Sequence, residues 1–259
     1  MSFNTGSVLQ SLLGRAKWAT YHLLCFGDYR RYMKLRAAAV RQLARRGWYE
    51  RDNVRYLQGV VRAGDTVVDV GANLGAYSIC LAAAVGSAGK VLAFEPLSET
   101  FEWLKENTAA LPQVQCVNTA LSDHSAASLQ IQVPLLFGCI PEASLAGFDT
   151  ATAMMQPRSV RVERLDDYLA ELERLSFIKV DVEGHEMAFL EGCRQTLARF
   201  PAVVQFECND IASRFGQLAA FTREVGYSLC TLEPGRGLDR LESPSTAKGN
   251  NFYLVPNRA

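Results

Sequence analysis

VVDVGANLGAYS, at residues 67–78, carries the strongest fold signal in this chain. The stretch opens with a short apolar run that is typical of a buried parallel strand, and an Ala/Leu-rich segment typical of a helix follows it. Gly71, Asn73 and Gly75 stand between the two and predict a tight turn. Because glycine has no Cβ, we expect Gly71 and Gly75 to let a small molecule lie against bare backbone.

The spacing of this turn favours one class of ligand over another. The dinucleotide fingerprint G-x-G-x-x-G would place Gly at position 73, where this chain has Asn73. Asp69, just ahead of the first glycine, indicates a ligand that carries an amino group. S-adenosylmethionine has such a group at its methionine end. The stretch therefore favours methyl transfer, with a nicotinamide oxidoreductase as an alternative.

The charge of the chain is balanced overall but unevenly distributed. Residues 1–62 contain 12 Lys/Arg and 3 Asp/Glu, whereas residues 63–259 contain 15 and 24. This pattern fits a solvated basic helix on an acidic body, and it also fits contact with a polyanion, a membrane surface or a lipid-linked substrate. The basic residues that recur at helical spacing are Arg30, Arg31, Lys34, Arg41, Arg45 and Arg46.

Composition indicates a globular protein with ample core material, since 49% of the 259 residues are hydrophobic. No apolar run reaches the roughly 18 residues that span a bilayer, and the first residues lack the pattern of a secretory signal. The seven cysteines include no C-x-x-C pair, as expected for reduced thiols. We therefore expect a cytoplasmic protein.

The order of patterns along the chain predicts a basic helical extension at residues 1–52 and one α/β domain at 53–259. The extension is expected to hold helices at 7–26 and 30–46, and the apolar face at 8–24 is a candidate homodimer surface. In the domain, strands and helices alternate, with an inserted loop near 134–158 over the mouth of the site. Predicted strands are 67–70, 91–94, 114–117, 129–133, 159–162, 177–180, 202–206, 227–232 and 251–255, and predicted helices are 53–62, 74–85, one from 98, 184–199 and 209–225.

Ligands of an open α/β sheet bind outside the carboxyl ends of its strands. Glu95 follows the second predicted strand, where a carboxylate can accept hydrogen bonds from both hydroxyls of a ribose. Ser122 and Asp123 follow the third, where an aspartate can accept from an exocyclic amine of adenine, although such residues also suit a plain turn.

The densest polar run, KVDVEGHE at residues 179–186, follows the fourth strand of the predicted parallel core. Asp181, Glu183 and His185 are the candidate catalytic residues, since four ionisable side chains at a strand end exceed what helix capping needs. Capping by Asp181 or Glu183, and a solvent-exposed His185, are the structural alternatives.

Five motifs together resemble the FkbM-type S-adenosylmethionine-dependent methyltransferase family. They are VVDVGANLGAYS, AFEP at 93–96, NTALSD at 118–123, VERLDDYL at 162–169 and IKVDVEGHE at 178–186. The resemblance implies a Rossmann-like class I fold, a seven-stranded, mostly parallel sheet with helices on both faces, and O-methylation of a sugar, glycan or natural product. It implies cofactor-binding roles for Asp69, Gly71, Asn73, Gly75, Glu95, Ser122 and Asp123. Asp181, Glu183 and His185 would face the acceptor.

Three questions stay open at this point. A hydroxyl acceptor needs a base, for which we favour Asp181 or His185, or a divalent cation held by Asp181, Glu207 and Asn209. Nucleic-acid methylation through the basic arm is disfavoured, because the fourth-strand motif lacks the aromatic and prolines that stack a flipped base. A nucleotide-binding protein without catalysis is the remaining alternative.

Overall fold

The computed structural model describes residues 29–136, 140–141, 154–233 and 235–257. The helix predicted at 7–26, the dimer surface predicted at 8–24 and most of the predicted insertion lie outside these ranges. Among the described residues, no helix is both long enough and apolar enough to cross a bilayer.

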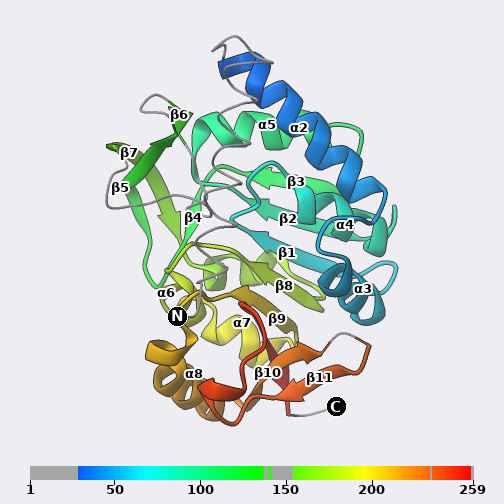
Figure 1. Ribbon diagram of the computed structural model, residues 1–259, viewed down its shortest axis with the longest axis vertical. Helices are drawn as coiled ribbons and strands as arrows, with labels where there is room; N and C mark the ends of the chain where they lie inside the picture. Colours follow the sequence, from blue (N-terminus) through cyan, green and yellow to red (C-terminus); the bar gives the residue numbers. More distant parts are fainter. Residues whose placement is uncertain (1–28, 137–139, 142–153, 234, 258–259) are drawn as a thin grey trace, which may run out of the picture.

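The main sheet has eight strands in the order β11-β10-β12-β9-β8-β1-β2-β3 (Figure 1). Neighbouring strands from β9 to β3 in this order pair in parallel. On the other side of β9, strands β12, β10 and β11 continue the sheet with antiparallel pairing. Because β1 lies between β2 and β8, the strand order reverses there, and a crevice is expected at that point. The bounds are β1 Thr66–Val70, β2 Lys90–Phe94, β3 Val114–Val117, β8 Phe177–Val180, β9 Val203–Glu207, β10 Tyr227–Glu233, β11 Gly237–Arg240 and β12 Asn251–Pro256.

This architecture confirms the Rossmann-like class I fold that the resemblance implied, but the strand count of seven was wrong. The eighth strand, β11, lies in the Pro/Gly-rich link between the strands predicted at 227–232 and 251–255, where no strand was predicted. Gly237 pairs with Glu233 and Arg240 with Cys230, so the link folds back as an edge strand. Strands β10 and β12 pair antiparallel.

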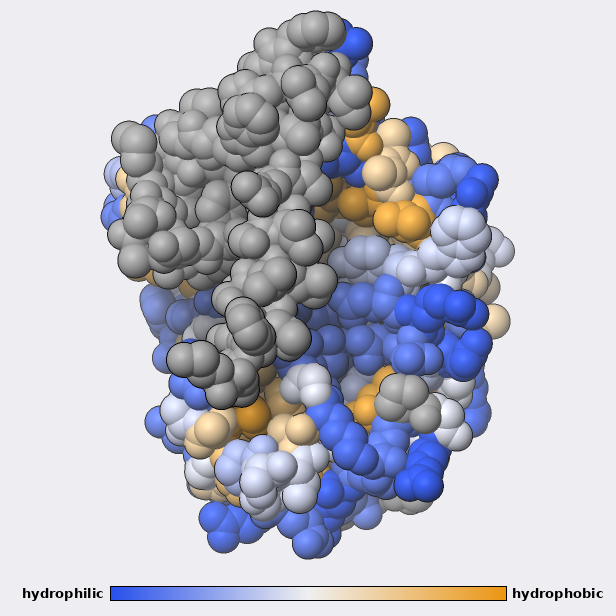
Figure 2. Space-filling model, in the orientation of Figure 1, coloured by the Kyte–Doolittle hydropathy of each residue, from blue (hydrophilic) through white to orange (hydrophobic). Residues whose placement is uncertain are grey.

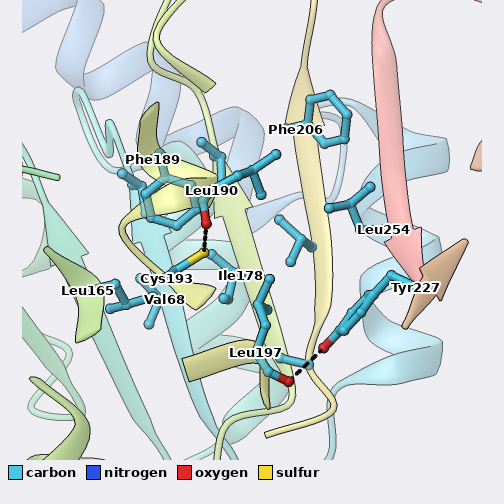
Figure 3. Close-up of a cluster of buried hydrophobic side chains, with 14 of the residues drawn as sticks. Val68, Leu165, Ile178, Phe189, Leu190, Cys193, Leu197, Phe206, Tyr227 and Leu254 are labelled. Atoms are coloured by element: carbon cyan, nitrogen blue, oxygen red, sulfur yellow. Dashed lines mark hydrogen bonds between the residues drawn. The ribbon is translucent and has the colours of Figure 1, made fainter. Parts of the chain in front are cut away.

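Helices cover both faces of the sheet. On one face, β-strand side chains pack with α6, α7 and α8 in a large apolar cluster that includes Ile178, Phe206 and Phe189 (Figure 3). On the other face, Val67 and Phe177 pack with residues of α2, α3 and α4. The bounds are α2 Tyr29–Arg45, α3 Arg51–Val60, α4 Ala76–Val85, α5 Ser98–Thr108, α6 Glu186–Glu191, α7 Arg194–Arg199 and α8 Ile211–Val225, with short 3-10 helices η2 Leu165–Glu171 and η3 Pro244–Thr246.

A second, four-stranded sheet in the order β4-β7-β5-β6 stands beside the carboxyl ends of the main strands (Figure 1). Its bounds are β4 Ala120–Leu121, β5 Ala126–Leu136, β6 Ile140–Pro141 and β7 Met154–Glu163. The prediction of loop from residue 134 to 157 was wrong at both ends, where β5 and β7 continue as an antiparallel pair. Pro157 is tolerated because β7 meets its second neighbour, β4, only at Val162 and Glu163.

The single helix predicted at 184–199 is two helices, because the chain breaks between α6 and α7 at Gly192 and Cys193. The boundary predicted at residue 52 stays a prediction. On the face shown in Figure 2, hydrophobic patches near the top and bottom are separated by a hydrophilic band.

Candidate functional site

A cavity of about 550 Å³ lies where the strand order reverses, at the carboxyl ends of β1, β2 and β8. Its volume falls within the usual range of small-molecule sites. The loops after these strands form its floor, and the second sheet and α2 add walls. Its lining includes Arg36, Val40, Tyr49, Asp69, Gly71, Asn73, Tyr77, Glu95, Thr119, Ser122, Leu129, Ile131, Val133, Met155, Lys179, Asp181, Glu183 and His185.

The first loop places Asp69 and Asn73 at the cavity, as predicted. Asp69 is only 2% exposed, and its Oδ2 accepts a hydrogen bond of 2.6 Å from the Ser78 hydroxyl of α4. Burial raises the pKa of Asp69 to about 6, although Ser78 and Lys179 both favour the ionised form. An ammonium group of a ligand would favour that form further.

The two glycines of this loop make close contact with protein rather than leaving open space. Gly71 has φ of 72°, and a Cβ there would lie 1.9 Å from the carbonyl oxygen of Asp181. Gly75 has φ of 84°, and its Cβ would lie 2.9 Å from Leu104 of α5. Gly71 lines the cavity, whereas Gly75 is absent from the lining. Both glycines therefore bring backbone close to a neighbouring element, and a contact with cofactor stays a prediction.

Glu95 is the best-defined polar group of the cavity. Its side chain is 2% exposed, and its oxygens accept backbone hydrogen bonds from Asn73 at 2.9 Å and Leu97 at 3.0 Å. Burial raises its pKa to about 7 against the effect of these two bonds. Each carboxylate oxygen can accept about two hydrogen bonds, so both keep capacity for a ligand hydroxyl.

The structure separates Ser122 from Asp123. Ser122 lines the cavity, and its Oγ lies 2.8 Å from Nε2 of His185. Asp123 is half exposed outside the cavity lining, and its Oδ1 lies 2.6 Å from Nδ1 of His124. Hydrogen bonds from His124 and Ser122 lower the pKa of Asp123. The pair predicted for adenine thus contributes one residue to the cavity and one to the surface.

Asp181, Glu183 and His185 all line the cavity on the side of β8. The Asp181 N–H donates to the carbonyl of Val70 at 2.9 Å, which fixes the loop after β8 against the end of β1. Glu183 has φ of 49°, a conformation that few side-chain-bearing residues adopt. His185 occupies the position before α6 and makes no side-chain cap bond. The capping alternative for Asp181 and Glu183 is therefore wrong, since neither precedes the helix directly.

Sequence reasoning missed Lys179 as a site residue. Its side chain is 1% exposed, and Nζ donates to the Val180 carbonyl at 3.1 Å and lies 4.9 Å from the centre of the Tyr77 ring. The available signal was a lysine between Ile178 and Val180 within an apolar strand. Such a position buries an ammonium group, which is rare unless the group has a partner.

Glu207 lies at the end of β9 near Asp181. Burial, followed by the charge of Asp181, raises its pKa to about 7. Asn250 donates from Nδ2 to Glu207, and to Asn209 at 3.3 Å. Within the part of the chain that the structure describes, no three His, Cys, Asp or Glu side chains form a group suited to a metal ion.

The residues of the cavity fit S-adenosylmethionine. Glu95 keeps acceptor capacity at the end of β2, where a ribose is expected. Asn73, whose N–H already donates to Glu95, lies at the same end of the cavity. Leu129, Ile131 and Val133 supply an apolar wall.

Comparison with known proteins identifies the family to which the chain belongs. The methyltransferase FkbM domain profile matches residues 69–229. The chain is 30% identical over 194 residues to methyltransferase sdnD of Sordaria araneosa, covering 63% of this chain and 73% of that protein. It is 30% identical over 150 residues to hexuronic acid methyltransferase AglP of Haloferax volcanii, covering 57% of this chain and 58% of that protein.

A solved structure of methyltransferase FkbM from Methylobacillus flagellatus superposes with a TM-score of 0.47 at 16% identity, covering 88% of this chain and 62% of that one. The domain match extends over more than half of the chain and includes the loops that build the cavity. The chain therefore belongs to the methyltransferase FkbM domain family, and it is an S-adenosylmethionine-dependent methyltransferase.

Proposed function

We propose that the protein methylates a hydroxyl group of a sugar, a glycan or another natural product. The observation that carries this proposal is that one cavity joins Glu95, at the end of β2, to Asp181, Glu183 and His185, after β8. The first group suits a nucleoside, and the second suits removal of a hydroxyl proton. AglP, whose name specifies a hexuronic acid, supports a sugar acceptor.

The reaction divides between cofactor and protein. S-adenosylmethionine supplies an electrophilic methyl group when it is bound. The chain must hold the acceptor hydroxyl in line with that methyl and remove the hydroxyl proton. Asp181 is the expected proton acceptor, because it lines the cavity next to the β1 loop. His185 is the second choice, since its Nε2 already contacts Ser122.

The apolar wall suggests how the acceptor is enclosed. Leu129, Ile131 and Val133 of β5 and Met155 of β7 line the cavity together with the charged loops. Leu129 is 38% exposed and Met155 is 47% exposed, so apolar surface remains for a ligand to cover. An acceptor with one polar and one apolar face, such as a sugar ring or a glycosylated natural product, would match both kinds of wall.

Delivery of a lipid-linked acceptor stays part of the proposal. On α2, Arg36 and Val40 line the cavity, while Lys34 and Leu35 are exposed on the same helix. A helix that carries basic and apolar side chains beside a cavity suits an acceptor held at an anionic membrane. Homodimer formation through residues 8–24 also stays a prediction.

Asp181→Asn tests the proposed chemistry. Because an amide cannot accept the hydroxyl proton, turnover should fall roughly 100-fold or more, while S-adenosylhomocysteine binds within about twofold of wild type. Calorimetry measures the binding, and transfer of labelled methyl to a panel of uronic acids, hexosides, glycosylated natural products and RNA measures the turnover. Asp239→Asn, on the exposed edge strand β11, is the matched control and should change neither quantity.

Two results would count against the proposal. Unchanged turnover in Asp181→Asn would remove Asp181 from the chemistry. Labelling of RNA, with no labelled sugar or natural product, would replace the proposed acceptor class by nucleic acid.

A further inference from the structure

Tyr49 reaches the cavity from a part of the chain that lies before the matched family domain. It lies between α2 and α3, whereas the domain profile begins at residue 69. Its side chain lines the same cavity as Asp181, and Arg36 and Val40 of α2 line that cavity as well. The segment before the matched domain therefore supplies part of the cavity wall.

The turn that carries Tyr49 is held on both sides. Before it, the Trp48 N–H donates to the Leu43 carbonyl at 2.9 Å and closes the end of α2. After it, Glu50 accepts a hydrogen bond of 2.5 Å from the Tyr77 hydroxyl of α4. The Tyr49 ring meets the Tyr77 ring edge-on, with 5.7 Å between the ring centres. Trp48 is 60% exposed, so of these two neighbouring aromatic residues one faces solvent and Tyr49 faces the cavity.

The Tyr49 hydroxyl is a hydrogen-bond donor among carboxylates. Burial, followed by the charges of Glu50 and Asp181, raises the pKa of Tyr49 above its usual value, so the phenol keeps its proton at neutral pH. No residue in the described ranges forms a hydrogen bond with this hydroxyl. A ligand hydroxyl can accept from the phenol and donate to a carboxylate at the same time, whereas a ligand carboxylate can only accept and is repelled by Asp181. The surroundings of Tyr49 thus favour a neutral hydroxyl as its partner.

We propose that the Tyr49 hydroxyl binds a second hydroxyl group of the acceptor, beside the one that is methylated, and so contributes to acceptor specificity. This inference rests on the proposed function and adds a requirement to it, namely that the acceptor carries at least two hydroxyl groups, as a sugar does. The residues predicted to bind the cofactor all lie between Asp69 and Asp123, so the cofactor has partners without Tyr49. The charge of Asp181 also acts on Tyr49 more strongly than that of Asp69 does, which agrees with a place on the acceptor side.

Tyr49→Phe removes the hydroxyl and keeps the ring. The probe acceptor is the hexoside or uronic acid of the panel with the highest wild-type turnover. Its KM should rise roughly 3- to 10-fold while kcat stays within about twofold, since a hydrogen bond that is equally strong before and during methyl transfer affects binding alone. The Kd for S-adenosylhomocysteine, measured by calorimetry, should stay within about twofold of wild type.

Tyr56→Phe is the matched control. Tyr56 lies in α3, is half-buried like Tyr49, and packs edge-on against Tyr253 outside the cavity lining. Loss of its hydroxyl should change neither the KM for the probe acceptor nor the Kd for S-adenosylhomocysteine. Thermal unfolding of both variants shows whether they fold.

Monodeoxy analogues of the probe acceptor identify the hydroxyl that Tyr49 binds. Among the analogues that are still methylated, one should raise the wild-type KM by about the same factor as Tyr49→Phe does. That analogue should not raise the KM of Tyr49→Phe further, because the hydrogen bond is already lost. The other analogues should affect the two enzymes by the same factor.

Three results would overturn this inference. They are an unchanged acceptor KM in Tyr49→Phe, a loss of S-adenosylhomocysteine binding as large as the loss of acceptor binding, and a set of analogues that all affect both enzymes alike. If wild type methylates a sugar and one of these results is found, only this inference fails. If wild type labels RNA alone, or no compound of the panel, the proposed function fails and this inference fails with it.

Discussion

Gly71 shows how a single residue holds the site together. Its positive φ is strained for any side-chain-bearing residue, and its missing Cβ leaves room for the Asp181 carbonyl. Gly71→Ala should therefore separate the ends of β1 and β8 and lower the free energy of unfolding by about 2 kcal/mol or more. Urea unfolding measures this change, and calorimetry should show weaker binding of S-adenosylhomocysteine.

Gly216→Ala is the control for that substitution. Gly216 is exposed within α8, and a methyl group added there would meet no heavy atom within 4 Å. Alanine at this position should raise the free energy of unfolding by about 0.5–1 kcal/mol. If Gly71→Ala were as stable as wild type, the close contact with Asp181 would not exist in solution.

The location of a candidate site residue followed from the sequence where backbone position decides it, while the roles of these residues stay predictions. Asp69, Glu95 and Asp181 reach one cavity because each lies at or just after the carboxyl end of a parallel strand. The location of a side chain did not follow from the sequence where side-chain direction decides it. Asp123 turns outward to His124, and Lys179 turns inward to the cavity, and neither direction follows from spacing alone.

At the scale of elements, the break between α6 and α7 depends on a contact from elsewhere in the chain. The carboxylate of Asp166 accepts hydrogen bonds from the N–H groups of Gln195, at 3.2 Å, and Thr196, at 2.8 Å, at the start of α7. A Cβ on Gly192, at the end of α6, would lie 1.8 Å from the carbonyl oxygen of Ser122. The break thus allows α6 to pack tightly against the loop that carries Ser122.

Gly192→Ala should push that loop away from α6. We expect the free energy of unfolding to fall by about 1–3 kcal/mol, and the Ser122 N–H, which donates to Glu163, to exchange faster with solvent. Urea unfolding and amide hydrogen exchange measure the two effects. Gly59→Ala in α3, where a Cβ meets nothing within 4 Å, should leave Ser122 exchange unchanged. Unaltered exchange in Gly192→Ala would contradict the contact.

The ends of a helix or strand could be predicted where the residues at that end determine them. The bounds of β8 agree with the prediction, because an apolar run ends at Asp181. The helix start predicted at residue 98 is confirmed, because α5 begins at Ser98. The residue before the helix is Leu97, and the Ser98 hydroxyl donates to Asn118. The α6–α7 break could not be predicted, since Asp166 lies 30 residues before Thr196 in the sequence.

At the scale of the whole molecule, the alternation of strands and helices predicted the sheet and its crevice. The right-handed crossover rule leaves few arrangements for such an alternation, and the reversal of strand order at β1 follows from them. The second sheet was harder to foresee, because β5 and β7 pair across a long segment of chain. Its apolar residues nevertheless help to close the cavity, so the second sheet and the core share one site.

The same crevice concentrates buried carboxyl groups, with consequences for stability. Burial raises the pKa of Asp69 to about 6 and those of Glu95 and Glu207 to about 7. A carboxyl whose pKa is higher in the folded protein than in the unfolded chain binds its proton more firmly when folded. Its contribution to stability is therefore full below about pH 4 and is lost as the pH rises through the folded pKa.

Between pH 5 and pH 8, these three groups should make the free energy of unfolding of the ligand-free protein fall as the pH rises. Glu207→Gln tests the effect, because the amide does not titrate and its oxygen can still accept from Asn250. Urea unfolding at half-unit steps of pH should give a shallower fall for Glu207→Gln than for wild type, with the curves differing most at pH 8. Glu242→Gln, at a surface position, should follow the wild-type curve. Parallel curves for Glu207→Gln and wild type would show that Glu207 is ionised with an ordinary pKa in the folded protein.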